Sequence, residues 1–414
     1  MPAVACGLDF GTSNSTLGVA GRLVPLEGDS VTLPSAVFWD ADGAPPRFGR
    51  AALAAYLEGE DGRLLRGLKS TLGSGLVQDR TRVGSRSVSF REVLARFIGQ
   101  MKTRAEHAVG AELTQVVMGR PVHFVDDDAA ADLAAQQVLE DIAREVGFAE
   151  VAFQFEPIAA ALDYETTVTA EELVLIVDIG GGTSDFSVVR VGPLSAGKAD
   201  RSADILANDG MRLGGTDFDR QFSLAEVMPD LGYLSSTKGG EGTMPRHYYL
   251  DLATWHRINT LYSDRVMADM KALRHEIDAP EKLDRMIRVL DGRQGHALAI
   301  AVEGAKIALS DAEATRLMLR PVTGGANPVA TRERLDAALA ASMDRVAARI
   351  GQVLAMAGTG PDQIATVFLT GGSSALPALR QVVVQAVPAA RLARGDDLAS
   401  VGTGLALEAA RRFG

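Results

Sequence analysis

The sequence predicts an α/β protein with two lobes around a cleft, in which one fold occurs twice. At 414 residues the chain is longer than a single hydrophobic core usually supports, which indicates two lobes. The segment GLDFGTSNSTLGVA at residues 7–20 is echoed by VDIGGGTSDFSVVRV at residues 177–191, and such repetition indicates a duplicated fold. Strand-like runs alternate with helical ones along the rest of the chain, as is typical of α/β proteins.

Each repeated segment is predicted to form a strand, a tight turn and a second strand. An apolar strand ends in Asp-x-Gly, small residues make the turn, and an alternating or β-branched run leads away from it. The two hairpins therefore present an aspartate and a glycine turn at equivalent positions.

The region between the hairpins is predicted to supply two helices and two strands. Ser89 and Glu92 stand in capping-box spacing at the start of a helix over 89–110. The apolar residues on one face of this helix predict that it packs on the core: Leu94, Phe97, Ile98 and Met101. A strand at 114–124, a helix at about 133–148 and the segment FQFEPIAAALDYE at 153–165 follow.

The second half of the chain is predicted to carry a helical subdomain insertion at about 224–300. A helix at 301–311, a polar β segment near 312–322, a helix at about 331–357, the segment TVFLTGGSSALPALRQVV at 366–383 and a last helix at 397–413 come after it. The predicted division is lobe I over 1–172, lobe II over 173–370 with the insertion, and a segment over 371–414 that returns to lobe I.

Charge and composition argue against several classes of function. The formal net charge is −11 and no long run of Lys and Arg occurs, so neither nucleic acid nor an anionic membrane surface is an expected partner. No apolar stretch reaches the roughly 18 residues that span a bilayer, and the start lacks a basic targeting region, so we expect a cytoplasmic protein. The single cysteine, Cys6, is expected to pack in a strand, and the six histidines show no paired metal spacing, so no zinc site is expected.

The glycine turns are suited to binding a polyphosphate. Backbone N–H groups approach a phosphate closely where no Cβ intervenes, which assigns this role to Gly11 and to Gly180, Gly181 and Gly182. Thr12, Ser13 and Thr183 add hydroxyl donors, and Asn14 can brace the first turn.

Two aspartates next to these turns predict a magnesium ion. Asp9 and Asp178 each stand at a strand end, and two carboxylates facing a triphosphate would repel it without a cation. Magnesium prefers oxygen ligands and keeps several waters, so we expect it to be bound largely through water.

These motifs, taken in order, resemble those of the DnaK-type heat-shock ATPases of the actin superfamily. The hairpins at 7–20 and 177–191 resemble the two phosphate motifs, and the segment at 153–165 resembles the first connecting motif. MRLGGTDFD at 211–219 is similar to the glycine turn after the second phosphate motif, TVFLTGGSSALP at 366–377 to the adenosine motif, and the last helix to the second connecting motif. The resemblance covers nearly the whole chain and implies a duplicated actin-like ATPase fold, which is ribonuclease H-like, around a nucleotide cleft.

The resemblance also implies roles for individual residues in binding ATP or ADP and Mg²⁺. Glu156 would orient the attacking water or the magnesium shell, and Lys69 in GLKSTLG would be the catalytic lysine, acting with Asp178 and Thr183. Asp9, Asp178 and Glu156 would hold the metal. The remaining nucleotide contacts are implied for Gly214, Gly215, Glu303, Lys306, Ser310, Gly371, Gly372, Ser373 and Asp396.

The sequence departs from the family pattern in three places. Ile307 and Ala375 stand where two arginines commonly sandwich the adenine, which predicts weaker adenine selectivity. Pro121 matches a proline that relays nucleotide state, but the arginine expected on the following helix is not found. No linker or peptide-binding domain is expected after Phe413, an arrangement similar to the stand-alone, YegD-like branch.

The leading hypothesis is a nucleotide-gated switch or chaperone with slow ATP hydrolysis, whose client or co-chaperone the sequence does not disclose. Two alternatives remain open. One is an actin-like filament subunit, which requires a self-complementary surface. The other is a small-molecule kinase on the same fold, which would require a base and a substrate pocket near the γ-phosphate. No additional carboxylate motif calls for such a base, although Asp185 and Asp217 lie in the right neighbourhood.

Overall fold

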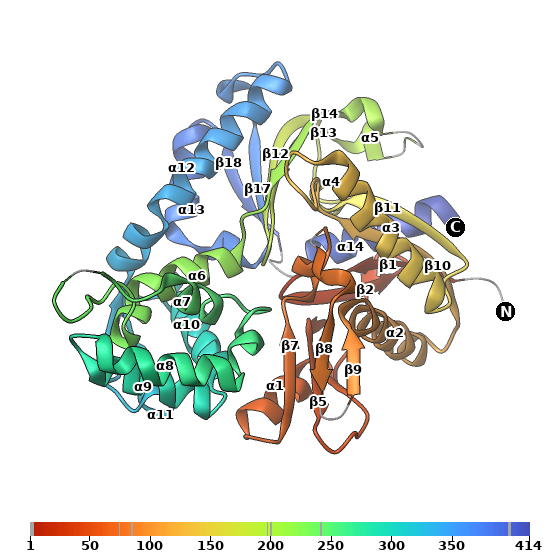
Figure 1. Ribbon diagram of the computed structural model, residues 1–414. Helices are drawn as coiled ribbons and strands as arrows, with labels where there is room; N and C mark the ends of the chain where they lie inside the picture. The colour runs from red at the N-terminus through yellow and green to blue at the C-terminus, as the bar shows by residue number, and fades with distance from the viewer. Residues whose placement is uncertain are drawn as a thin grey trace. The chain divides into compact units, whose positions relative to one another are not determined.

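The computed structural model describes residues 4–73, 75–83, 86–196, 198, 201–240, 242–395 and 399–414 (Figure 1). The chain forms two compact units. The first unit comprises Met1–Gly215, Asp344–Ala375 and Leu379–Gly414, and the second unit comprises Thr216–Met343 and Leu376–Ala378. The predicted lobe boundaries at residues 172 and 370 stay predictions.

Two sheets of the first unit share one strand order. In the first sheet the order is β11-β10-β1-β2-β3, with β4 also paired to β2. Its strands are β1 (Val4–Asp9), β2 (Asn14–Val19), β3 (Arg22–Leu23), β4 (Thr32–Pro34), β10 (Leu113–Arg120) and β11 (Glu150–Phe155). β1 pairs antiparallel with β2 and parallel with β10, and β10 pairs parallel with β11.

The second sheet repeats this arrangement in the order β14-β13-β12-β17-β18. Its strands are β12 (Glu172–Ile179), β13 (Ser184–Val191), β14 (Ile205–Met211), β17 (Thr366–Thr370) and β18 (Arg391–Arg394). β12 pairs antiparallel with β13 and parallel with β17, which pairs parallel with β18. The predicted α/β class and the duplication are therefore confirmed at the level of topology.

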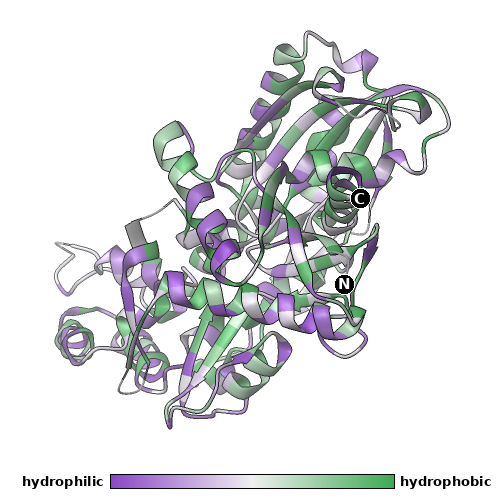
Figure 2. Ribbon diagram, turned by 90° about the vertical axis from the view of Figure 1, so that its right-hand side faces the viewer, coloured by the Kyte–Doolittle hydropathy of each residue, from purple (hydrophilic) through white to green (hydrophobic). Residues whose placement is uncertain are grey.

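Helices of the first unit cover these sheets. The predicted helix at 89–110 is confirmed as α2 (Phe90–Val109), and the Ser89 hydroxyl accepts a hydrogen bond from the Glu92 amide at 3.1 Å. α4 (Glu156–Glu165) and α14 (Ser400–Phe413) pack closely, because a Cβ on Gly404 would lie 1.8 Å from the Ala159 carbonyl oxygen. In Figure 2 the central strands are mostly green and the helices mix green with purple, as expected for amphipathic helices on buried strands.

The other elements of the first unit are shorter or peripheral. They are β5 (Ala36–Asp40), β6 (Arg47–Phe48), α1 (Arg50–Leu57), β7 (Gly62–Arg66), η1 (Leu68–Thr71), η2 (Gly75–Gln78), β8 (Arg80–Val83), β9 (Arg86–Ser89), α3 (Ala129–Glu145), α5 (Pro193–Ala196), η3 (Ser202–Asp204), η6 (Pro361–Gln363) and η7 (Gly372–Ala375). Cys6 is fully buried in β1, as predicted, and burial raises the pKa of its thiol.

The second unit is mostly helical. Its elements are η4 (Met228–Leu231), α7 (Arg246–Leu252), η5 (Ile258–Leu261), α8 (Asp264–Glu276), α9 (Pro280–Asp291), α10 (Gly295–Asp311), β15 (Ala314–Arg316), α11 (Arg320–Thr323) and β16 (Val329–Thr331). Three further helices have residues in both units: α6 (Gly215–Glu226), α12 (Arg332–Met356) and α13 (Pro377–Ala386). In the described part of the chain, none of the helices combines the length and the apolar character that crossing a membrane requires.

Candidate phosphate-binding site

Charged side chains from four segments of the first unit meet in its interior. Asp9 ends β1, Asp178 lies near the end of β12, and Glu156 begins α4. Lys69 lies in η1, and its Nζ donates to Glu156 Oε1 at 2.5 Å, with side chains that are only 6% and 9% exposed. Lys69 and Glu156 thus form a buried ion pair between segments 87 residues apart.

Burial and neighbouring charges shift the pKa values of these groups. Burial, Glu156 and the other carboxylates raise the pKa of Asp178. Burial and Glu156 also raise the pKa of Asp9 to about 7, although Lys69 opposes this. Burial alone would lower the pKa of Lys69. The negative charges of Glu156 and Asp9 stabilise its ammonium form more strongly, so this pKa lies above its ordinary value. Asp9 and Asp178 therefore belong to one electrostatic group.

The two predicted glycine turns are in contact. A Cβ built on Gly181 would lie 2.4 Å from Ser13 Oγ and 3.2 Å from the Ser13 nitrogen. A Cβ on Gly182 would lie 2.7 Å from Thr12 Oγ1. Because the turns belong to different sheets, their backbone N–H groups can face one phosphate chain from two sides.

Two further glycine segments border the second turn. The Gly215 amide donates to the Gly180 carbonyl at 2.9 Å, and a Cβ on Gly214 would lie 2.5 Å from the Gly182 nitrogen. Gly371 has a φ of 82°, and a Cβ there would lie 2.6 Å from Asp178 Oδ1. The structure thus brings the predicted segments at 214–215 and 371–373 to the turn that follows Asp178, and Ser373 Oγ donates to the Gly180 carbonyl at 3.4 Å.

Ser35 braces the first turn, a role that no sequence motif predicts. Its Oγ donates to the Gly11 carbonyl at 2.7 Å, and its amide donates to the Ser13 carbonyl at 2.9 Å. Asn14, predicted as the brace, begins β2 and pairs with Pro34. Ser35 lies between β4 and β5, about twenty residues further along the chain, so no local pattern marks it.

Asp185, which the sequence placed near the phosphates only under the kinase alternative, belongs to the same group of buried carboxylates. It is 1% exposed, lies opposite Asp178 in the β12–β13 pairing, and accepts from the Val122 amide at 2.6 Å. Burial and Glu156 raise its pKa to about 7, although hydrogen bonds from Val122 and Thr183 oppose the shift. The available signal was hairpin register, because residues that flank a turn at equal distances face each other across the two strands.

The charge balance of the group fits a bound cation. Asp9, Asp178, Asp185 and Glu156 supply four carboxylates against one lysine, and such an excess in a buried site raises carboxyl pKa values until a cation neutralises it. Among the residues that the structure describes, no three His, Cys, Asp or Glu side chains form a ready-made metal site.

The residues predicted to contact ribose and adenine lie in the second unit, on α10. Glu303, Lys306 and Ser310 have the spacing of one helical face, and Lys306 pairs with Asp219 at 2.8 Å with both side chains buried. Ile307 is 59% exposed. Whether these residues meet the phosphate turns stays a prediction, and Asp396 lies outside the described residues.

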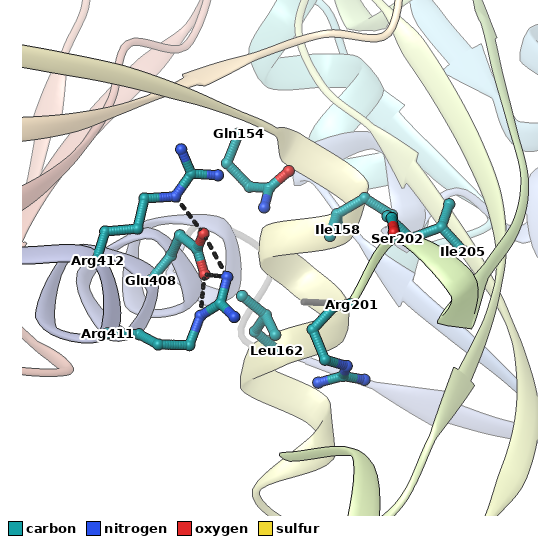
Figure 3. Close-up of a pocket in the computed structure, with 9 residues that line it drawn as sticks. All are labelled: Gln154, Ile158, Leu162, Arg201, Ser202, Ile205, Glu408, Arg411 and Arg412. Atoms are coloured by element: carbon teal, nitrogen blue, oxygen red, sulfur yellow. Dashed lines mark hydrogen bonds and ion pairs between the residues drawn. The ribbon is translucent and has the colours of Figure 1, made fainter. Parts of the chain in front are cut away.

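A separate pocket of about 530 Å³ in the first unit does not include the carboxylate group. None of Asp9, Asp178, Asp185 and Glu156 lines it. The lining residues are Gln154, Ile158, Leu162, Arg201, Ser202, Ile205, Glu408, Arg411 and Arg412. Figure 3 shows Glu408 between the guanidinium groups of Arg411 and Arg412, which keep its pKa below its ordinary value although burial opposes this. Arg201 pairs with Glu165 at 2.6 Å. Since each arginine of this pocket has a carboxylate partner, the glycine turns remain the better phosphate site.

The contact between the two turns predicts different effects for neighbouring glycines. Gly181→Ala should lower the free energy of unfolding by about 1–3 kcal/mol, because its Cβ would overlap Ser13. Gly180→Ala is the matched control, because the nearest atom to its Cβ is 3.8 Å away. Denaturant unfolding without nucleotide measures both variants. Equal stabilities would contradict the contact.

The raised pKa of Asp9 predicts a pH dependence of stability. The folded state holds this proton more tightly than the unfolded state, so the group's contribution is present at low pH and is lost as pH rises towards about 7. In EDTA, the free energy of unfolding of the wild type should therefore fall, relative to that of Asp9→Asn, between about pH 4.5 and about pH 7.5. Parallel pH curves for the two proteins would show that Asp9 titrates normally.

Two sheets with one strand order, whose hairpin turns meet beside buried carboxylates and a lysine, define a protein of the actin-like ATPase superfamily. A family model described as Hsp70 protein matches residues 71–227 and 268–410. These segments make up well over half of the chain, so it belongs to the Hsp70 family. The predicted resemblance is thereby confirmed, while the stand-alone branch within the family stays a prediction.

The chain is also similar to curated chaperone proteins. It is 28% identical, over 431 aligned positions, to a chaperone protein HscA homolog of Azotobacter vinelandii, covering 98% of this chain and 57% of that protein. It is 32% identical over 305 positions to a chaperone protein HscA homolog of Laribacter hongkongensis, covering 67% of this chain and 46% of that protein. The chain thus spans about half the length of the curated relatives that it matches.

Proposed function

We propose that the chain binds ATP or ADP with magnesium at the phosphate site and hydrolyses ATP slowly. The observation that carries this proposal is the contact of Gly181 with Ser13 beside the ion pair of Lys69 and Glu156. Two glycine turns, an ammonium and an excess of carboxylates are what binding and neutralising a polyphosphate require.

The residues would divide the chemistry between them. The turns donate backbone N–H groups to the phosphates, and Lys69 stabilises the charge that develops on the transferred phosphoryl group. Glu156, anchored by Lys69, orients the attacking water, while Thr183 adds a hydroxyl near Asp178. A bound magnesium ion would supply neutralisation of phosphate charge, with Asp9, Asp178, Asp185 and Glu156 holding its water shell.

Nucleotide selectivity would be modest. Ile307 and Ala375 offer no guanidinium face to an adenine ring, and each cation–π contact of that kind contributes about 0.5–2 kcal/mol. ATP should therefore exceed GTP in affinity by less than it does in proteins that carry both arginines.

The proposed biological role is that of a nucleotide-gated, chaperone-like switch whose partner is a protein. The supporting observation is the similarity to proteins named as HscA chaperones. A net charge of −11 argues for a protein partner over nucleic acid or an anionic membrane, and a cytoplasmic location belongs to the same proposal.

Calorimetric titration with ATP, ADP and GTP, each with magnesium and with EDTA, tests the proposal. We expect binding of ATP and ADP that EDTA weakens at least about tenfold, and phosphate release slower than about 1 per minute. Absence of nucleotide binding in magnesium would refute the proposed function. Binding without phosphate release would refute hydrolysis alone.

A further inference from the structure

Arg120 is buried next to the phosphate site, and neither the glycine motifs nor the family resemblance assigns it a role. It ends β10 immediately before Pro121 and is only 9% exposed. Its Nη2 donates to Asp132 Oδ2 on α3 at 2.6 Å, and its Nη1 donates to Gln136 Oε1 on the same helix at 2.5 Å. The guanidinium is therefore neutralised and held rigidly from the α3 side.

The same guanidinium also hydrogen-bonds to the backbone segment after β10, which in turn bonds to Asp185. Its Nη2 also donates to the Val122 carbonyl at 3.0 Å, and its Nε donates to the Pro121 carbonyl at 3.0 Å. The amide of Val122 in turn donates to Asp185 Oδ1 at 2.6 Å. The Pro121 carbonyl and the Val122 N–H belong to one planar peptide unit, so the bond from Arg120 to that carbonyl restrains the N–H that holds the Asp185 carboxylate.

Arg120 also contacts the residue before Glu156. Its guanidinium carbon lies 5.2 Å from the ring centre of Phe155 and 5.2 Å from that of Phe124. Phe155 ends β11 and is the N-cap residue of α4, which begins at Glu156. The planar guanidinium contacts both rings, an interaction that depends on its orientation. Because Phe155 is the N-cap residue, this contact restrains the start of α4.

We propose that Arg120 is a positioning residue that holds Asp185, through Val122, and Glu156, through Phe155, in the geometry that the phosphate site requires. This inference rests on the proposed function of that site. This one buried side chain makes four N–H hydrogen bonds and contacts two phenylalanine rings. Val122 and Phe155 connect it to the two carboxylates. A lysine keeps the charge but offers neither the fork nor the planar face.

Arg120→Met and Arg120→Lys test the proposal, with Arg144→Met as the matched control. Arg144 lies on α3, the helix to which Arg120 donates, and its side chain is 50% exposed in an ion pair with Glu140. At saturating ATP, Arg120→Met should lower the single-turnover rate about 10- to 100-fold, because displacing a reacting group by about 1 Å costs up to about 100-fold. The Kd for ATP in excess magnesium should change less than about threefold, and Arg120→Lys should lose less than Arg120→Met.

A second readout does not depend on nucleotide. Hydrogen exchange of the Val122 amide, measured without nucleotide, should be faster in Arg120→Met by about tenfold and unchanged in Arg144→Met. Exchange at the wild-type rate would overturn the proposal, and so would wild-type turnover by a folded variant. If Arg120→Met does not fold, the same two measurements on Arg120→Lys decide. If the wild type binds no nucleotide, the proposed function fails, while the Val122 exchange still supports or overturns the positioning role.

Discussion

Asp178→Asn is expected to abolish magnesium-dependent nucleotide binding and to leave the fold intact. Asp178 is 5% exposed, and asparagine has the same shape as aspartate, so the substituted side chain fits the same space. The substitution removes a negative charge from the group that would balance magnesium. We expect ATP to bind at least about 100-fold more weakly, which corresponds to about 2.8 kcal/mol.

The same substitution should not destabilise the nucleotide-free protein. The pKa of Asp178 is raised by burial and by its carboxylate neighbours, so its charge opposes folding at neutral pH. An asparagine removes that repulsion, and the melting temperature in EDTA should stay the same or rise. A residue that mainly supports the fold would show the reverse pattern.

Calorimetry with ATP and thermal unfolding in EDTA measure the two effects. Asp29→Asn is the control, because Asp29 is exposed and carries the same change in charge. Wild-type ATP affinity in Asp178→Asn would remove this carboxylate from the site. A fall in melting temperature together with a loss of binding would assign Asp178 a structural role instead.

Lys69→Met is expected to stop hydrolysis while ATP still binds. The ammonium of Lys69 forms an ion pair with Glu156. Methionine fills nearly the same volume as the aliphatic part of lysine but carries no charge. A preorganised charge next to a developing anion contributes about 100- to 1,000-fold to the rate, so we expect a loss of that size. The Kd for ATP should change less than about threefold, because the glycine turns and magnesium supply most of the binding.

This variant should also lose stability without nucleotide. Removing one partner of a buried ion pair leaves Glu156 uncompensated among other carboxylates, which costs about 3–5 kcal/mol. Magnesium and ATP should restore part of this loss, because ligands that bind the folded state stabilise it.

Single-turnover phosphate release, with ATP affinity measured in parallel, separates the two effects. Lys271→Met is the control, because Lys271 is exposed on α8. Phosphate release at the wild-type rate would remove Lys69 from the catalytic group. A loss of affinity equal to the loss of rate would show that Lys69 binds the ground state and the transition state alike.

Local chemistry was sufficient to predict α2 and the duplicated hairpins. The Ser89 cap and the apolar face of α2 depend on residues three or four positions apart, and the hairpins follow from strand patterns interrupted by glycine turns. The equivalence of Asp9 and Asp178 was likewise visible because the two segments repeat. Signals of this kind lie within one turn of helix or one hairpin, where sequence spacing fixes spatial distance.

The sequence by itself therefore determined the α/β class, the repeated strand-turn-strand units and the residue types of the phosphate turns. Only the tertiary structure decided which distant side chains complete the site: Ser35, which donates to the first turn, and Arg120, which contacts Val122 and Phe155. The pairing of Lys69 with Glu156 joins segments 87 residues apart. Contacts of this kind arise when sheets and helices pack, and no periodicity along the chain encodes which distant residues the packing brings together.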